Sequence, residues 1–217
     1  SALYGPPVGA AKLNANENPY GPSPAALKAM MEATQSGAYY VRESAQKLRD
    51  AIAETHGLSR DHVMLSSGSS GVLTYLALAA TQQGSILGPD LFWDTTALMG
   101  ARNSEFGIKR LPKRPDLAID LAAMEQALND DVSLVHITNP NNPTGSALEA
   151  SALRAFCAKA SSKTMVLVDE AYNELTDNPD QSTMIPLVKE GRNVAVAPTF
   201  TKTYALAGMR LGYRMAK

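Results

Sequence analysis

Residues 199–212 read TFTKTYALAGMRLG, and the expectations for the whole chain start from this stretch. It follows an apolar run, Val194–Ala197, of the kind that forms a buried β-strand. Lys202 stands among three threonines, and Arg210 lies between two glycines. A lone lysine after a strand is ordinarily a solvated loop residue. Whether Lys202 has a functional role therefore depends on which polar residues the rest of the chain places near it.

The composition is that of an ordinary globular protein. Of 217 residues, 45% are hydrophobic and 19% charged, which is enough apolar material for a sizeable core. The net charge of -1 gives no electrostatic footprint for nucleic acid or an anionic membrane. The single cysteine, Cys157, excludes an internal disulfide, and we expect it to be a packed hydrophobe. A reducing compartment fits this usage, so we expect a cytoplasmic location.

Targeting and metal signals are absent from the sequence. No apolar run reaches the roughly 18 residues that span a bilayer. The N-terminus has no charged-then-apolar export signal, although processing could have removed one. The three histidines, His56, His62 and His136, lack metal-ligand spacing, so no metal site is expected.

Apolar strand-like runs alternate with helical patterns from residue 62 onward. Strands are predicted at 62–66, 85–88, 106–111, 132–137, 164–168, 194–198 and 211–215, and helices at 71–80, 95–102, 121–128, 148–159 and 186–190. Unbroken Val, Leu and Ile runs between helices indicate a mostly parallel sheet covered on both faces. The fold class is therefore a three-layer α/β/α sandwich.

The N-terminal region has a different pattern. Residues 13–24 read LNANENPYGPSP, and their Asn, Pro and Gly content predicts an ordered loop, which Leu13 and Tyr20 should pack down. A helix over 24–34 with Ser23 as its cap should follow, and then a helix over 44–56.

Polar residues follow four of the predicted strands, at the sheet edge where ligands bind in such folds. Residues 67–71 read SGSSG before an apolar helix, which makes either a phosphate cup or a plain turn with a serine cap. Residues 139–145 read NPNNPTG and carry more amides than a turn needs, which suggests a ligand.

A carboxylate and a phenol come after the strand at 164–168. Burying Asp169 costs several kcal/mol unless a cation faces it, so either a structural salt bridge or a cationic ligand is expected. Tyr172 can add its hydroxyl to the same pocket. The strand ends together offer an anion site, amides, a carboxylate and an amine, which is the set that a pyridine aldehyde phosphate needs.

These motifs resemble those of a known family. Residues 142–145, 169–172 and 199–202 with Arg210 resemble the fold-type I pyridoxal-phosphate aminotransferases of class I/II. The loop at 13–21 is similar to that of the histidinol-phosphate aminotransferase-like branch, and the similarity runs over nearly the whole chain.

The resemblance implies a domain division. Residues 1–57 would form an N-terminal arm and the first part of a small domain, and residues 58–217 a large domain that binds pyridoxal 5'-phosphate. The C-terminal part of the small domain would lie outside these residues, together with the arginine that binds the substrate carboxylate.

The resemblance also implies residue roles. Lys202 would bond to the cofactor aldehyde and move protons, and Asp169 would pair with the pyridine nitrogen. Asn142 and Tyr172 would hydrogen-bond the ring oxygen. The phosphate would be held by Ser69, Ser70, Thr199 and Arg210.

Two aromatic positions depart from the family pattern. Tyr40 aligns with a tyrosine that reaches the partner subunit's phosphate, which implies a homodimer, but Tyr39 and Val41 replace the usual neighbours Arg and Pro. Either Phe92 or Trp93 would cover the ring face, because residues 89–93 replace the family's Pro-Thr-Tyr pattern.

The implied activity is amino transfer between an L-amino acid or an amino alcohol phosphate such as histidinol phosphate and 2-oxoglutarate. A decarboxylase or cyclase on the same scaffold would use the same lysine and aspartate, since the cofactor supplies the electron sink and the pocket selects the bond that breaks. A non-catalytic cofactor-binding regulatory module is the third alternative.

Overall fold

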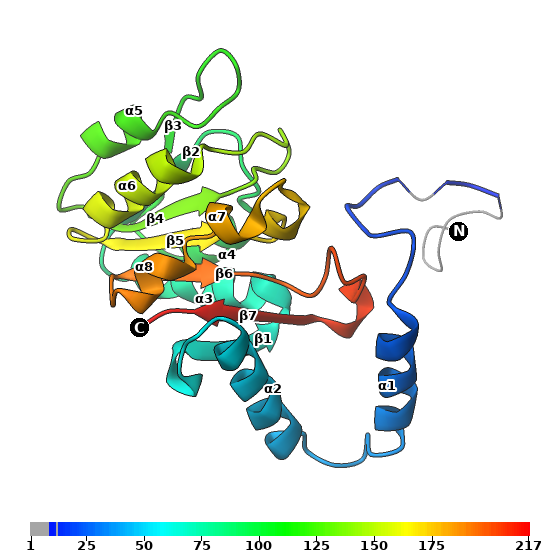
Figure 1. Ribbon diagram of the computed structural model, residues 1–217. Coiled ribbons are helices and arrows are strands. Elements are labelled where there is room, and N and C mark those ends of the chain that lie inside the picture. The colour runs from blue at the N-terminus through cyan, green and yellow to red at the C-terminus, as the bar shows by residue number, and fades with distance from the viewer. Residues whose placement is uncertain (1–8, 12) are drawn as a thin grey trace.

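The computed structural model describes residues 9–11 and 13–217, which contain one mixed sheet of seven strands (Figure 1). The strand order is β1-β7-β6-β5-β4-β2-β3. The strands are β1 Val63–Ser67, β2 Ser85–Pro89, β3 Ile108–Leu111, β4 Val132–Thr138, β5 Met165–Asp169, β6 Val194–Ala197 and β7 Leu211–Met215. All seven predicted strands are present, with bounds that differ by at most two residues.

The directions of the strands bring the polar strand ends together. Strands β2 to β6 pair in parallel, whereas β7 is antiparallel to both β1 and β6, so β1 points the same way as the parallel set. Thr138 pairs with Asp169, and Asp169 pairs with Ala197. The carboxyl ends of β1, β4, β5 and β6 therefore meet the start of β7 at one edge. This confirms the mostly parallel sheet.

Helices cover both faces of the sheet, as predicted for a three-layer sandwich (Figure 1). The helices are α1 Pro24–Thr34, α2 Arg42–Thr55, α3 Gly68–Ala80, α4 Thr95–Ala101, α5 Leu121–Gln126, α6 Ala150–Ala160, α7 Pro179–Ser182 and α8 Ile185–Lys189. Short 3-10 turns lie at Arg60–His62, Asn173–Leu175 and Ala207–Met209. One core cluster packs α3 and α4 against the sheet, and the other packs α2, α5, α6 and α8.

Sequence signals account for most of these elements. The Ser23 hydroxyl accepts a hydrogen bond from Ala26 N at 3.2 Å and so caps α1 as predicted. Cys157 is fully buried in α6, in agreement with its expected packing role. Helix α3 begins three residues before its predicted start, and α7 was not predicted because its sequence, PDQS, has no apolar periodicity.

The N-terminal strap, defined here as residues 13–21, was predicted wrongly in one respect. Leu13 is 87% exposed and Tyr20 is 94% exposed, so neither packs the strap down. Polar bonds hold it instead, among them one from Asn18 Nδ2 to Thr203 O at 3.0 Å. A short loop rich in Asn and Pro cannot bury its few apolar side chains unless a neighbouring surface receives them.

The domain division at residue 57 stays a prediction. Residues 1–8, which belong to the predicted N-terminal arm, lie outside the described residues. Ile52 and Ala53 of α2 are buried in the same core cluster as the strands, whereas α1 contributes no buried residue. Within the described residues, no helix is long and apolar enough to cross a membrane.

Candidate active site

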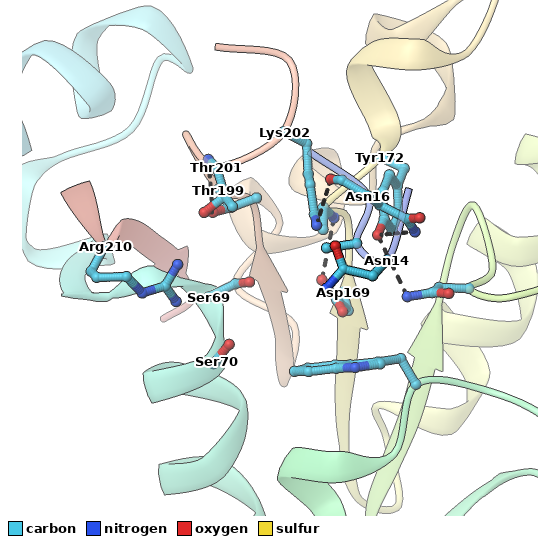
Figure 2. A pocket seen from close by; sticks show the side chains of 14 residues that line it. Asn14, Asn16, Ser69, Ser70, Asp169, Tyr172, Thr199, Thr201, Lys202 and Arg210 are labelled. Atoms are coloured by element: carbon cyan, nitrogen blue, oxygen red, sulfur yellow. Dashed lines mark hydrogen bonds between the residues drawn. The ribbon is translucent and has the colours of Figure 1, made fainter. Parts of the chain in front are cut away.

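A cavity of about 430 Å³ lies at the edge where the strand ends meet. Nine of the ten residues predicted for the site line it: Ser69, Ser70, Trp93, Asn142, Asp169, Tyr172, Thr199, Lys202 and Arg210. Thr201, Asn14, Asn16 and the small residues Ala15 and Ala171 complete the wall. Figure 2 shows Ser69, Ser70 and Arg210 on one side and Tyr172, Asn16 and Lys202 on the other.

The first side, called here the anion end, is built around the first turn of α3. Gly68 N donates a hydrogen bond to Arg210 O at 2.9 Å, which ties this turn to the start of β7. A Cβ on Gly68 would lie 2.4 Å from Arg210 Nη2, so another residue there would displace the guanidinium from its present position. A Cβ on Gly212 would lie 2.3 Å from Ser69 N. Close approach of two backbones therefore requires glycine at position 212, and the positive φ of 70° favours it at position 68.

The anion end has the features of a phosphate site. Ser69 and Ser70 lie at the N-terminus of a 13-residue helix, where free N–H groups and the helix dipole favour an anion. Arg210 adds a full positive charge, and its Nη1 is held by Ala207 O at 2.9 Å. Its backbone adopts the left-handed conformation at φ 52° and ψ 51°, which a residue with a Cβ adopts only at a cost. A phosphate group fits this cradle.

Two threonine hydroxyls stand between the ends of the cavity. Thr199, 2% exposed, has its Oγ1 2.7 Å from Thr201 Oγ1, and Thr201 N donates to Thr199 Oγ1 at 3.2 Å. Thr201 was not predicted as a site residue. The sequence held a signal for Thr201, because alternate residues in extended chain, such as Thr199 and Thr201, point to the same side.

The other side, called here the reactive end, is held together by contacts among Lys202, Tyr172, Asn16 and Asn142. Lys202 Nζ donates to Asn16 O at 2.9 Å and lies 5.5 Å from the centroid of the Tyr172 ring. The Tyr172 hydroxyl accepts from Asn16 Nδ2 at 3.0 Å and from Asn142 Nδ2 at 3.5 Å (Figure 2). Asn16 was not predicted as a site residue, because nothing in the sequence distinguishes it from the other asparagines of the strap.

Asp169 lies at the end of β5 and is 3% exposed. Burial raises its pKa to about 7, and the Ala171 N–H and the charge of Lys202 oppose that rise. Among the described residues, no lysine or arginine forms an ion pair with it, so the salt bridge considered above is not found. A buried carboxylate of this kind fits a ligand that carries a positive charge, such as a protonated pyridine nitrogen.

The structure separates the two candidates for the aromatic position. Phe92 is 5% exposed and packs edge-on against His136, with ring centroids 5.1 Å apart, whereas Trp93 lines the cavity. Tyr40 does not line the cavity of its own chain. It lies between α1 and α2 and is 96% exposed, and its role toward a partner subunit stays a prediction.

The histidines take no part in the cavity. His136 is fully buried in β4, and burial lowers its pKa to about 4. In the described part of the chain, no group of three His, Cys, Asp or Glu side chains could hold a metal ion.

Comparison with known proteins places this geometry in a family context. The family described as aminotransferase class I and II matches residues 9–217. Histidinol-phosphate aminotransferase of Akkermansia muciniphila is 35% identical over 210 residues, and histidinol-phosphate aminotransferase 1 of Cupriavidus pinatubonensis is 36% identical over 212 residues. These matches cover 94% and 97% of this chain and 56% of each relative.

A solved structure agrees with the sequence relatives. Histidinol-phosphate aminotransferase from Sinorhizobium meliloti, solved in complex with pyridoxal-5'-phosphate, superposes with a TM-score of 0.84 at 28% identity. The superposition covers 93% of this chain and 55% of that one. The chain therefore spans about half the length of the relatives that it matches.

Proposed function

The chain belongs to the aminotransferase class I and II family, and from this premise we propose that it carries the cofactor site of a pyridoxal-phosphate-dependent aminotransferase. The proposal rests on the side chains that line one cavity. An amine, an anion cradle and a buried carboxylate line the same 430 Å³ space, and within the described residues that carboxylate forms no ion pair. A phosphorylated pyridine aldehyde is the ligand class that uses all three.

The residues of the cavity divide the tasks of holding the cofactor. Arg210, Ser69 and Ser70 would hold its phosphate, and Asp169 would keep a proton on the pyridine nitrogen. Trp93 would cover the ring and exclude water. When bound, pyridoxal 5'-phosphate supplies an electron sink for the α-carbon of an amino acid.

Lys202 and Tyr172 would carry the proton chemistry. Lys202 Nζ would bond to the cofactor and, once displaced by the substrate amine, take and return the proton at the substrate α-carbon. Its contact with Asn16 O already directs Nζ into the cavity wall beside Tyr172. Tyr172 and Asn142 would hydrogen-bond the ring oxygen and so fix the ring plane relative to Lys202.

The substrates belong to the proposal as well. We propose an amino alcohol phosphate such as histidinol phosphate, or an L-amino acid, as amino donor and 2-oxoglutarate as acceptor. The names of the relatives support the donor class, although the chain spans about half of their length. We also propose a homodimer in which Tyr40 reaches the partner's site. The proposed location is the cytoplasm. The exposure of Tyr40 is compatible with a contact to a partner subunit, and the burial of Cys157 is compatible with a cytoplasmic location.

Absorption spectroscopy tests the proposal. The intact protein incubated with pyridoxal 5'-phosphate should gain a visible absorption band, and borohydride should remove that band and leave the cofactor mass on Lys202. A protein that gains neither the band nor the mass does not hold the cofactor as proposed. A screen of amino donors for 2-oxo acid formation or carbon dioxide release then separates a transaminase from a decarboxylase.

A further inference from the structure

We propose that Asn16 is a positioning residue for the Tyr172 hydroxyl. Its side-chain amide occupies an acceptor position on the phenol oxygen, so the hydroxyl proton is left to be donated to the cofactor ring oxygen. This inference rests on the proposed function, because it concerns how the cavity meets pyridoxal 5'-phosphate. It assigns a role to the N-terminal strap, which is far from Tyr172 in the sequence.

The hydrogen bonds around the Tyr172 phenol leave its proton unused. A tyrosine hydroxyl has one proton to donate, and its oxygen can accept. Asn16 Nδ2 donates to that oxygen at 3.0 Å and Asn142 Nδ2 donates at 3.5 Å. In the described part of the chain the phenol is seen only as an acceptor. Its proton therefore remains available for a ligand.

Asn16 contacts both Lys202 and Tyr172. Its carbonyl accepts from Lys202 Nζ at 2.9 Å, and its amide reaches Tyr172, so one coil residue contacts both groups of the reactive end. Replacing its side chain leaves the carbonyl in place. Asn16 is exposed and belongs to no helix or strand, so the replacement acts on the phenol without disturbing the core.

Loss of the Asn16 amide should shift the titration of the bound cofactor to higher pH. A hydrogen bond donated to the ring oxygen stabilises negative charge there. Weakening that donation raises the pH at which the chromophore bound to Lys202 loses its proton. In Asn16→Ala the phenol loses one partner that orients it. In Asn16→Asp the carboxylate can only accept, so it should draw the phenol proton away from the cofactor.

The experiment is a pH titration of the visible absorption of the cofactor-loaded protein without substrate. Asn16→Ala should raise the midpoint by about 0.4 to 1 pH unit, the equivalent of one hydrogen bond. Asn16→Asp should raise it further. Asn14→Ala and Asn14→Asp are the matched controls, because Asn14 lines the same cavity from the same strap. They report any effect of truncation or added charge alone.

A double-mutant cycle separates positioning from a general effect on the cavity. In a Tyr172→Phe background, Asn16→Ala should shift the midpoint no further, because the hydroxyl on which Asn16 acts is gone. Equal shifts in both backgrounds would overturn the proposal. So would a midpoint in Asn16→Ala below that of the wild-type protein, since it would mean that the phenol normally donates to residue 16 and that truncation frees its proton for the cofactor.

The outcomes keep this inference distinct from the proposed function. A wild-type protein without a visible band rejects the cofactor assignment itself. A protein with the band, whose midpoint does not differ between the Asn16 and Asn14 variants, rejects only the role of Asn16. Thermal unfolding of each variant checks that the fold is retained, so that an altered midpoint reports the cavity.

Discussion

The anion end and the reactive end of the cavity are built in different ways. At the anion end, backbone groups of α3 and β7 approach so closely that Gly212 cannot carry a Cβ, and the Arg210 guanidinium lies against Gly68. At the reactive end, Lys202 bonds to the backbone carbonyl of Asn16, whose side chain bonds to Tyr172, and none of the three lies in a helix or strand. Packing therefore fixes the first end, whereas hydrogen bonds fix the second. A Cβ added to the backbone contact at the first end should therefore lower stability, whereas substitution of Lys202, Tyr172 or Asn16 at the second should alter the chemistry.

Lys202→Ala gives the largest expected effect, and it should break the reactive end alone. Turnover should fall by about 10²–10⁴-fold or more, the contribution of a positioned acid-base group. The cofactor should still bind noncovalently through the anion end, without a borohydride-stable adduct. Mass spectrometry and steady-state rates measure both, with the exposed Lys163→Ala as control. Unchanged turnover would remove Lys202 from its proposed role.

Asp169→Asn should change how the stability of the cofactor-free protein depends on pH. The unfolded carboxyl ionises near 3.8 and the folded one at about 7, so between these values the unfolded state holds fewer protons and rising pH favours unfolding. About 3 pKa units at 1.36 kcal/mol each give a loss of roughly 4 kcal/mol. The variant should lack this loss.

Urea unfolding of both proteins from about pH 4 to about pH 7 measures the effect of Asp169. Glu170, whose pKa burial raises to about 8, adds a slope of the same sign that remains in both proteins. Saturation with the cofactor should reduce the wild-type loss, because a cation then faces the carboxylate. Parallel curves for the two cofactor-free proteins would contradict the argument.

Gly212→Ala should damage the anion end through packing. The new Cβ would meet Ser69 N at 2.3 Å and Gly68 C at 2.4 Å, both backbone atoms that a rotamer change cannot move. We expect a loss of about 1–3 kcal/mol in the free energy of unfolding. Gly208→Ala is the control, since nothing lies within 4 Å of its Cβ. Equal stability of the two variants would show that α3 can move away.

Arg210→Lys gives the smallest expected effect and sharpens the comparison. Lysine keeps the charge but loses the planar fork that bonds two phosphate oxygens. Affinity for pyridoxal 5'-phosphate should fall about 10-fold, in the range of one hydrogen bond to a charged group. Affinity for pyridoxal, which has no phosphate, should not change. Equilibrium dialysis with both ligands makes the test, and an equal loss for both would place Arg210 outside the anion end.

The sequence predicted the elements and the grouping of the cavity residues well. Leu211–Met215 was predicted as a strand with the observed bounds, because its apolar residues lie between clear loop signals. Its antiparallel direction was not predicted, since an apolar run does not encode direction. Ser69, Asn142, Asp169 and Lys202 could be grouped because the ends of parallel strands share one edge of a sheet.

The N-terminal strap shows where sequence reasoning fails. Leu13 and Tyr20 were expected to anchor it, but an apolar side chain is buried only where a complementary surface lies nearby, and the sequence does not show that surface. Asn16 was missed for the opposite reason. An asparagine in a loop ordinarily forms a local turn, and only the folded chain brings this one to Tyr172.

The position of β7 also has a consequence for synthesis. β7 lies between β1 and β6, and Val63 pairs with Met215, so the two partners are separated by more than half of the chain. During synthesis, β1 and the turn that begins α3 therefore have no hydrogen-bonding neighbour until β7, which begins at Leu211, has been made. Contacts so distant in sequence form late and slowly. A nascent chain that stalls before β7 has a sheet with an unpaired β1 and no anion end.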